Sequence, residues 1–231
     1  QKILTHAALL NGIRTLIAIG GSTNAVLHTL ALGHELGMDT AELLSQWDTL
    51  SRTTPTLALI NPASAQWDMA DFYLAGGIPR VMQHLLPLLD GSCLTVTGAT
   101  LAADLKNYRF LYPPNDALIR PLNAPHQATG GLAVLYGNLA PEGCISKPAA
   151  VAAENRYFRG PAVCFDSQED CLAALEARRI HAGQVVVIRY EGPKGSGMPE
   201  MFYTTEAISS DPELGKTIAL ITDGRFSGAS K

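Results

Sequence analysis

The stretch Val-Val-Val-Ile-Arg-Tyr-Glu-Gly-Pro-Lys-Gly-Ser-Gly, residues 185–197, changes character in its middle. The run from Val185 to Ile188 is β-branched throughout and predicts a buried strand. Glu191 and the glycine-rich residues that follow it are typical of a loop. Ligand sites in α/β proteins gather beyond the carboxyl ends of strands. This junction is therefore a candidate site, with the carboxylate of Glu191 at the start of the loop.

A second junction of the same design lies downstream. Residues 217–222 predict a strand, and the sequence Asp-Gly-Arg-Phe-Ser at 223–227 predicts the loop after it. Arg225 is a candidate for binding a substrate carboxylate, although an ion pair with Asp223 is an equally natural role. Ser227 is a candidate for chemistry, although a lone serine in a tight loop is most often a turn residue.

The sequence Gly20-Gly21-Ser22-Thr23-Asn24 precedes a predicted helix. It places main-chain N–H groups, two hydroxyls and an amide at a helix N-terminus, an arrangement that can hold a carboxylate or a phosphate. Simple helix capping explains the same residues. We take Ser22, Thr23 and Asn24 as candidate substrate-binding residues.

Composition and charge bound the class of protein. The chain has 231 residues, 47% of them hydrophobic, which is enough for one large domain or two modest ones. The net charge is -4, so the chain lacks the excess of basic residues that is typical of nucleic-acid-binding proteins, and we do not expect a nucleic-acid partner. No apolar run of membrane-spanning length and no signal-peptide pattern is present. We therefore expect a cytoplasmic protein with no membrane partner.

The four cysteines, Cys93, Cys144, Cys164 and Cys171, are scattered and form no C-x-x-C pair. This spacing argues against a disulfide framework and against a self-contained zinc site. We expect buried, reduced thiols. The chain has no initiator methionine and stops soon after the loop at 223–227, so we also expect an internal fragment of a longer protein.

Residues 107–127 combine tyrosines and prolines with weak periodicity, which indicates a domain boundary. We predict an α/β fold in which residues 1–115 form the C-terminal part of an α/β domain. Residues 116–231 then form a β-rich, barrel-like domain with few helices, incomplete at its C-terminus. The predicted helices cover residues 2–16, 25–36, 39–50, 69–74, 76–89 and 168–177. The predicted strands cover residues 56–60, 94–96, 131–136, 143–147, 160–165, 184–190 and 217–222.

Seven different short motifs are spread along nearly the whole chain. They are Gly20–His28, Ala75–Pro79, Leu94–Gly98, Thr129–Leu135, Gly137–Gly143, Tyr190–Lys194 and Thr222–Gly228. In this order they resemble the dihydroxy-acid dehydratase and 6-phosphogluconate dehydratase family. The resemblance implies a hydro-lyase that converts a 2,3-dihydroxy acid to a 2-keto acid with the help of an iron–sulfur cluster and Mg²⁺.

The resemblance also implies roles for particular residues. Glu191 would be a Mg²⁺ ligand, and Ser227 would remove the C2 proton, which requires nearby cations because serine is a weak base at its ordinary pKa. In the family, the cysteines of the cluster and the remaining acidic Mg²⁺ ligands lie upstream of the Gly20–Asn24 motif. The four cysteines of this chain are therefore not assigned as ligands, and we expect the fragment to be inactive alone.

Several alternatives stay open. The motif Tyr190–Lys194 resembles the enzyme of branched-chain amino-acid synthesis, whereas Ser227-Gly228-Ala229-Ser230 resembles members that act on sugar acids such as aldonates or phosphogluconate. A rival of another class is a non-catalytic module that binds a small anion at Gly20–Asn24, and a third is a purely structural domain. We expect the full-length protein to bind a small dihydroxy acid and to form a homodimer.

Overall fold

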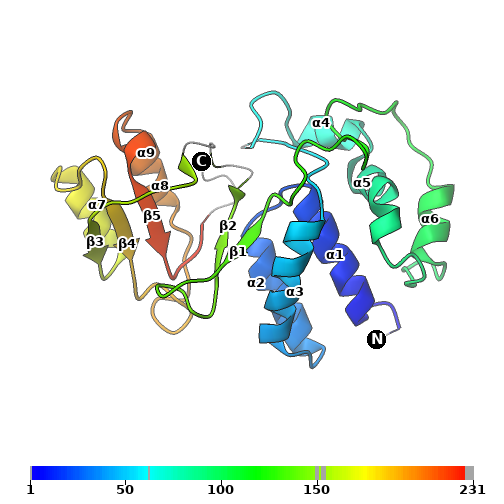
Figure 1. Cartoon of the computed structure of the whole chain (residues 1–231), viewed down its shortest axis with the longest axis horizontal. Helices are drawn as coiled ribbons and strands as arrows, with labels where there is room; N and C mark the ends of the chain where they lie inside the picture. The colour runs from blue at the N-terminus through cyan, green and yellow to red at the C-terminus, as the bar shows by residue number, and fades with distance from the viewer. Residues whose placement is uncertain (1, 62, 149–150, 152–154, 227–231) are drawn as a thin grey trace. The chain divides into compact units, whose positions relative to one another are not determined.

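A computed structural model of the chain describes residues 2–61, 63–148, 151 and 155–226. The chain divides into two compact units, Gln1–Ala150 and Val151–Lys231 (Figure 1). This division lies later in the sequence than the domain boundary at 115/116, which stays a prediction.

Helices dominate the first unit. They are α1 (His6–Ala18), α2 (Asn24–Glu35), α3 (Thr40–Thr53), α4 (Met69–Leu74), α5 (Gly77–Leu85), the short 3-10 helix η1 (Leu86–Leu88) and α6 (Leu101–Asn107). Short polar side chains start several of them: the Thr5 hydroxyl accepts the Ala8 N–H ahead of α1, and the Asp39 carboxylate accepts two N–H groups ahead of α3. The strands β1 (Ala133–Leu135) and β2 (Cys144–Ser146) form an antiparallel pair.

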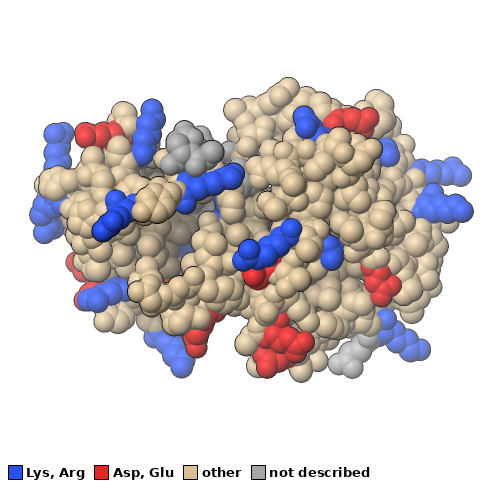
Figure 2. Space-filling model, viewed as in Figure 1, with Lys and Arg blue, Asp and Glu red and all other residues tan. Residues whose placement is uncertain are grey.

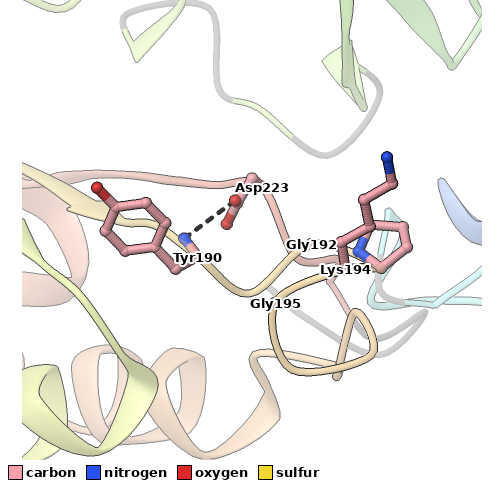
Figure 3. A pocket seen from close by; sticks show the side chains of 6 residues that line it. Tyr190, Gly192, Lys194, Gly195 and Asp223 are labelled. Atoms are coloured by element: carbon pink, nitrogen blue, oxygen red, sulfur yellow. Dashed lines mark hydrogen bonds between the residues drawn. The ribbon is translucent and has the colours of Figure 1, made fainter.

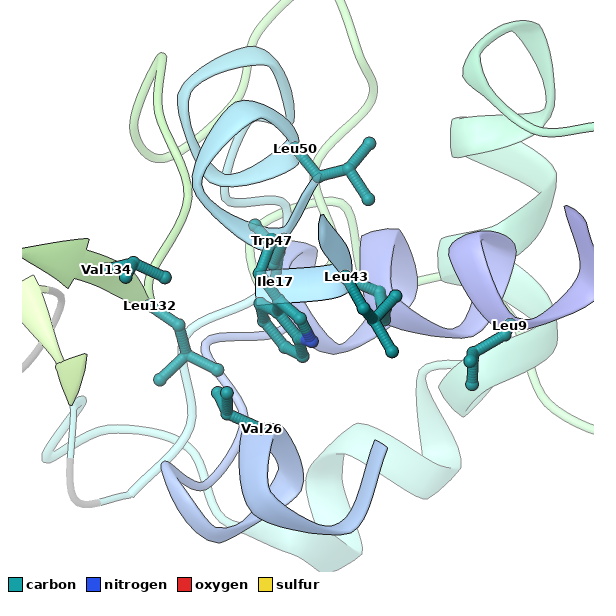
Figure 4. Close-up of a cluster of buried hydrophobic side chains, with 9 residues drawn as sticks. Leu9, Ile17, Val26, Leu43, Trp47, Leu50, Leu132 and Val134 are labelled. Atoms are coloured by element: carbon teal, nitrogen blue, oxygen red, sulfur yellow. The ribbon is translucent and has the colours of Figure 1, made fainter. Parts of the chain in front are cut away.

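The core of the first unit is built around Trp47 on α3, which is 1% exposed. Figure 4 shows Trp47 among side chains from α1, α2 and the segment that leads into β1, including Ile17, Val26 and Leu132. The indole N–H of Trp47 donates a hydrogen bond of 3.0 Å to the Thr29 hydroxyl. The largest apolar side chain of the cluster is therefore buried without an unpaired polar group.

The second unit contains a three-stranded parallel sheet and the helices that connect its strands. Its strands, in spatial order, are β3 (Ala162–Phe165), β4 (Val185–Ile188) and β5 (Ala219–Thr222). Parallel neighbours need crossover connections, which are supplied by α7 (Gln168–Glu176) and by α8 (Phe202–Ser209) with α9 (Leu214–Thr217). Alternate residues of the central strand, Val186 and Ile188, are fully buried against this layer of helices. The strand predicted at 184–190 is thus confirmed.

The five strands predicted beyond residue 130 are all present, but the predicted barrel is wrong for the described residues. There the strands form two separate sheets of two and three strands. The barrel prediction failed because α8 and α9 were not recognised; with these helices as crossovers the second unit has only three parallel strands, too few to close into a barrel. The strands predicted at 56–60 and 94–96 are only isolated bridges, which pair Thr56 with Gln127, Ala58 with Ile119 and Leu94 with Thr100.

The surface carries both signs of charge. On the face seen in Figure 2, Lys and Arg side chains are interspersed with Asp and Glu, in keeping with the net charge of -4. Within the described ranges, none of the helices combines the length and the apolar character that crossing a membrane requires.

Candidate active site

The two junctions singled out in the sequence meet at one edge of the three-stranded sheet. Ile188 at the end of β4 pairs with Thr222 at the end of β5, so the loops that follow start side by side. The loops border an open hollow of about 510 Å³, which is lined by Tyr190, Gly192, Pro193, Lys194, Gly195 and Asp223. Figure 3 shows Tyr190, Lys194 and Asp223 around this hollow. The loops after β4 and β5 therefore lie side by side at one edge of the sheet.

Asp223 joins the two loops directly. One oxygen of its carboxylate accepts the Tyr190 N–H at 3.0 Å and the other accepts the Glu191 N–H at 2.9 Å. Tyr190 has φ of 64°, in the left-handed region that non-glycine residues rarely adopt. The carboxylate thus binds the turn at the point where its backbone is strained.

The Glu191 side chain is buried, with only 4% of the residue exposed. Its Oε1 accepts the Gln168 N–H at 2.6 Å, at the first residue of α7, and its Oε2 accepts the Ser196 hydroxyl. The positive end of the α7 dipole favours a negative charge at this place. Both oxygens therefore already have protein partners, one on a helix and one in the loop. No role was predicted for Ser196 from the sequence, because its position inside the glycine-rich loop was its only distinguishing feature.

Arg225 is tied to the far end of the same loop. Its Nε donates to the Met198 carbonyl at 2.9 Å, and a terminal nitrogen forms an ion pair of 2.8 Å with Glu200. The carboxylate that pairs with Arg225 is therefore Glu200 and not Asp223, the other role considered from the sequence. The Glu200 side chain is 37% exposed, so it is more accessible than the buried carboxylate of Glu191 at the start of the same loop. The prediction that Arg225 binds a substrate carboxylate stays a prediction.

Ser227, the predicted base, lies outside the described residues. Its position relative to Glu191 is therefore not described. Two main-chain hydrogen bonds hold the residues just before Ser227. The Met201 N–H donates to the Arg225 carbonyl at 2.8 Å, and the Arg225 N–H donates to the Pro199 carbonyl at 3.3 Å. The chain that leads to Ser227 is thus held by the loop after β4 up to Arg225.

Ser22, Thr23 and Asn24 lie in the first unit, at the start of α2. Thr23 occupies the cap position without a side-chain cap bond, and the Ser22 hydroxyl accepts the Asn24 N–H at 3.2 Å. All three residues are partly buried. Ser22 thus satisfies one N–H of the helix start, as capping predicts, while substrate binding by these three residues stays a prediction.

The cysteines do not form a cluster. All four are free; Cys171 is buried, Cys93 is partly buried, and Cys144 and Cys164 are exposed. The prediction of buried thiols is thus confirmed for Cys171 and wrong for Cys144 and Cys164. Burial raises the pKa of the Cys171 thiol to about 11, so it stays protonated at neutral pH.

The side chains present do not complete a site for either of the implied metal groups. Among the described residues, His, Cys, Asp and Glu side chains nowhere gather in a group of three or more that could hold a metal ion. Glu191 offers one buried carboxylate whose oxygens both accept protein hydrogen bonds. These residues fit neither a magnesium site nor an iron–sulfur site by themselves, so neither group enters the reaction steps assigned to this chain.

Family models match almost the whole chain. The model described as dihydroxy-acid/6-phosphogluconate dehydratase N-terminal matches residues 1–104, and its C-terminal counterpart matches residues 117–231. The chain belongs to this family. The resemblance read from the short motifs is therefore confirmed.

Curated members of the dehydratase family align with all of this chain. The chain is 48% identical to the dihydroxy-acid dehydratase of Koribacter versatilis, covering 39% of that protein. It is 46% identical to that of Thermosynechococcus vestitus and 44% identical to that of Sulfurisphaera tokodaii, covering 40% and 41% of them. The chain thus spans about 40% of the length of the dehydratases that it matches.

Proposed function

We propose that the protein containing this chain is a hydro-lyase that dehydrates a 2,3-dihydroxy carboxylic acid to a 2-keto acid. The observation that carries the proposal is the identity of 44–48% to three dihydroxy-acid dehydratases along the full length of the chain. The overall reaction removes the proton from C2 and the hydroxyl from C3 as one water. The enol that results tautomerises to the keto acid.

The chain contributes one wall of the proposed site. Ser227 is proposed to take the C2 proton, and its place two residues after Arg225 puts it directly beyond the segment that the loop after β4 holds. Serine is a weak base at its ordinary pKa, so this role requires positive charge nearby. Lys194, which lines the hollow, and Arg225, which forms an ion pair with Glu200, are two cationic side chains of this wall.

The cofactor assignments remain proposals that rest on the family resemblance. An iron–sulfur cluster and Mg²⁺ would supply Lewis-acid chemistry, with the cluster held by cysteines upstream of this chain. Glu191 as a Mg²⁺ ligand stays a prediction; each oxygen of its carboxylate accepts one protein hydrogen bond and keeps a second lone pair that a cation could use. A cytoplasmic location and a homodimeric assembly are likewise predictions.

An anaerobic assay of the complete gene product tests the proposal. We expect keto acid from 2,3-dihydroxy-3-methylbutanoate and little from gluconate, xylonate or 6-phosphogluconate. Turnover of a sugar acid alone would move the substrate to the sugar-acid branch of the family. No keto acid from any of these substrates would refute the dehydratase proposal.

The role of Ser227 is tested by Ser227→Ala. The variant should lose at least about 10²-fold in kcat, the scale on which a general base contributes. Ser209→Ala, at an exposed serine that ends α8, is the matched control and should leave kcat unchanged. Normal turnover by Ser227→Ala with unchanged metal content would remove Ser227 as the base.

A further inference from the structure

The backbone conformation of Tyr190 determines the course of the loop after β4. The N–H groups of Gly195 and Met198 both donate to the Gly192 carbonyl, at 3.0 and 3.2 Å, so the loop turns back on itself. Gly195 packs so closely on the Tyr190 carbonyl that an added Cβ would overlap it. A change in the backbone of Tyr190 would therefore displace the whole returning segment.

Asp223 holds that conformation from the neighbouring strand. Its two carboxylate oxygens accept two successive N–H groups, those of Tyr190 and Glu191. Such charge-assisted hydrogen bonds are stronger than neutral ones. Their free energy offsets the conformational strain of Tyr190, a non-glycine residue with φ of 64°. Figure 3 shows the Asp223 carboxylate directed at the Tyr190 nitrogen across the gap between the two chain segments.

Asp223 also begins the segment that leads to Ser227. Two residues later, Arg225 binds the far end of the loop through the Met198 carbonyl and Glu200. The segment 223–225 thus holds the loop after β4 at both of its ends. The Asp223 carboxylate and the Arg225 side chain therefore fix the loop after β4 against the segment 223–225.

We infer that Asp223 is a positioning residue, which fixes the loop 190–198 against the exit of β5 and so holds this wall of the proposed site in the geometry that turnover requires. The inference rests on the proposed function for its effect on catalysis. Its structural part, the hold on Tyr190 and Glu191, stands independently of any activity.

The isosteric variant Asp223→Asn tests the inference. An amide offers one acceptor oxygen, and its NH₂ group would oppose the second main-chain N–H, so one of the two bonds is lost. We expect amide hydrogen exchange in residues 190–198 to rise at least about tenfold, the effect of roughly 1.4 kcal/mol. In the complete gene product, kcat should fall by roughly 10²-fold with KM changed less than about threefold, because a misplaced reacting group slows turnover more than it weakens binding.

Asp166→Asn is the matched control. Asp166 follows β3 at the same sheet edge as Asp223 follows β5, and both are exposed, but Asp166 pairs with the Arg189 side chain instead of main-chain N–H groups. We expect it to leave exchange in 190–198 and turnover unchanged. Equal effects of the two variants would overturn the inference, as would unchanged exchange in Asp223→Asn. Faster exchange with normal kcat would overturn the link to catalysis.

A measurement on the unmodified chain covers the case in which Asp223→Asn does not fold. The amide hydrogens of Tyr190 and Glu191 should exchange at least about tenfold more slowly than that of the exposed Lys194. Equal exchange would overturn the inference without any variant. Absence of keto acid from the unmodified enzyme would instead count against the proposed function alone.

Discussion

The carboxylate of Glu191 lies 2.6 Å from the main-chain nitrogen of Gln168, the first residue of α7. The same carboxylate accepts the hydroxyl of Ser196 from the loop after β4. A single buried side chain therefore links the end of the central strand, the start of a helix and the loop at the candidate site. The link has consequences for stability that are separate from any metal.

Glu191→Ala should lower the free energy of unfolding by about 2–3 kcal/mol. The substitution leaves the Gln168 N–H and the Ser196 hydroxyl without their acceptor and removes a favourable charge from the start of α7. Urea unfolding in the presence of EDTA measures the effect without metal. Glu206→Ala, at an exposed position of α8, should stay within about 0.5 kcal/mol of the unmodified protein. If the loss appeared only when Mg²⁺ is present, Glu191 would act through the metal alone.

Local patterns predicted the elements of the site better than the contacts between them. The β-branched run of β4 and the apolar strand β5 were predictable because a short continuous apolar run bounded by turn residues favours a strand. Helix α8 was missed because Phe202-Tyr203-Thr204-Thr205 is aromatic and β-branched, a composition that favours strands.

The pairing of Arg225 shows a different limit. Asp223 is near Arg225 in the sequence, yet the returning loop brings Glu200 to the guanidinium, and the Asp223 carboxylate turns to the main chain after β4. Such partners depend on how the loop folds back, which no local pattern records. The family motifs located the residues of the loop, but not the residues that each of them binds.

In the first unit, Thr29→Val should lower the free energy of unfolding by about 1–2 kcal/mol. Valine keeps the shape of the side chain but removes the oxygen that accepts the Trp47 indole N–H, which is then buried without a partner. Chemical unfolding monitored by circular dichroism measures the change. Thr49→Val, at an exposed position of α3, should be nearly neutral. A loss of equal size in both variants would show that the indole bond contributes nothing specific.

Gly130→Ala should lower the free energy of unfolding by about 2–3 kcal/mol. A Cβ at this position would overlap the Ile17 side chain and crowd the Ser51 carbonyl, and both lie in the packed first unit. Gly12→Ala is the opposite case, because it lies within α1 with open space around its Cα, and it should stabilise the chain by about 0.5–1 kcal/mol. Thermal unfolding of both variants should shift in opposite directions. A stable Gly130→Ala variant would contradict the close packing.

Cys171 has no exposed surface, and burial raises the pKa of its thiol from 9.0 to about 11. As the pH rises from about 9 to about 11, the thiol ionises first in the unfolded chain. Its stabilising contribution is fully present below about pH 9 and is lost as the pH rises through about 11, by roughly 2–3 kcal/mol. Urea unfolding at several pH values measures the loss. Cys171→Ala should lack this component, whereas Cys164→Ala, at an exposed thiol of β3, should retain it. Identical pH profiles for the unmodified protein and Cys171→Ala would refute the prediction.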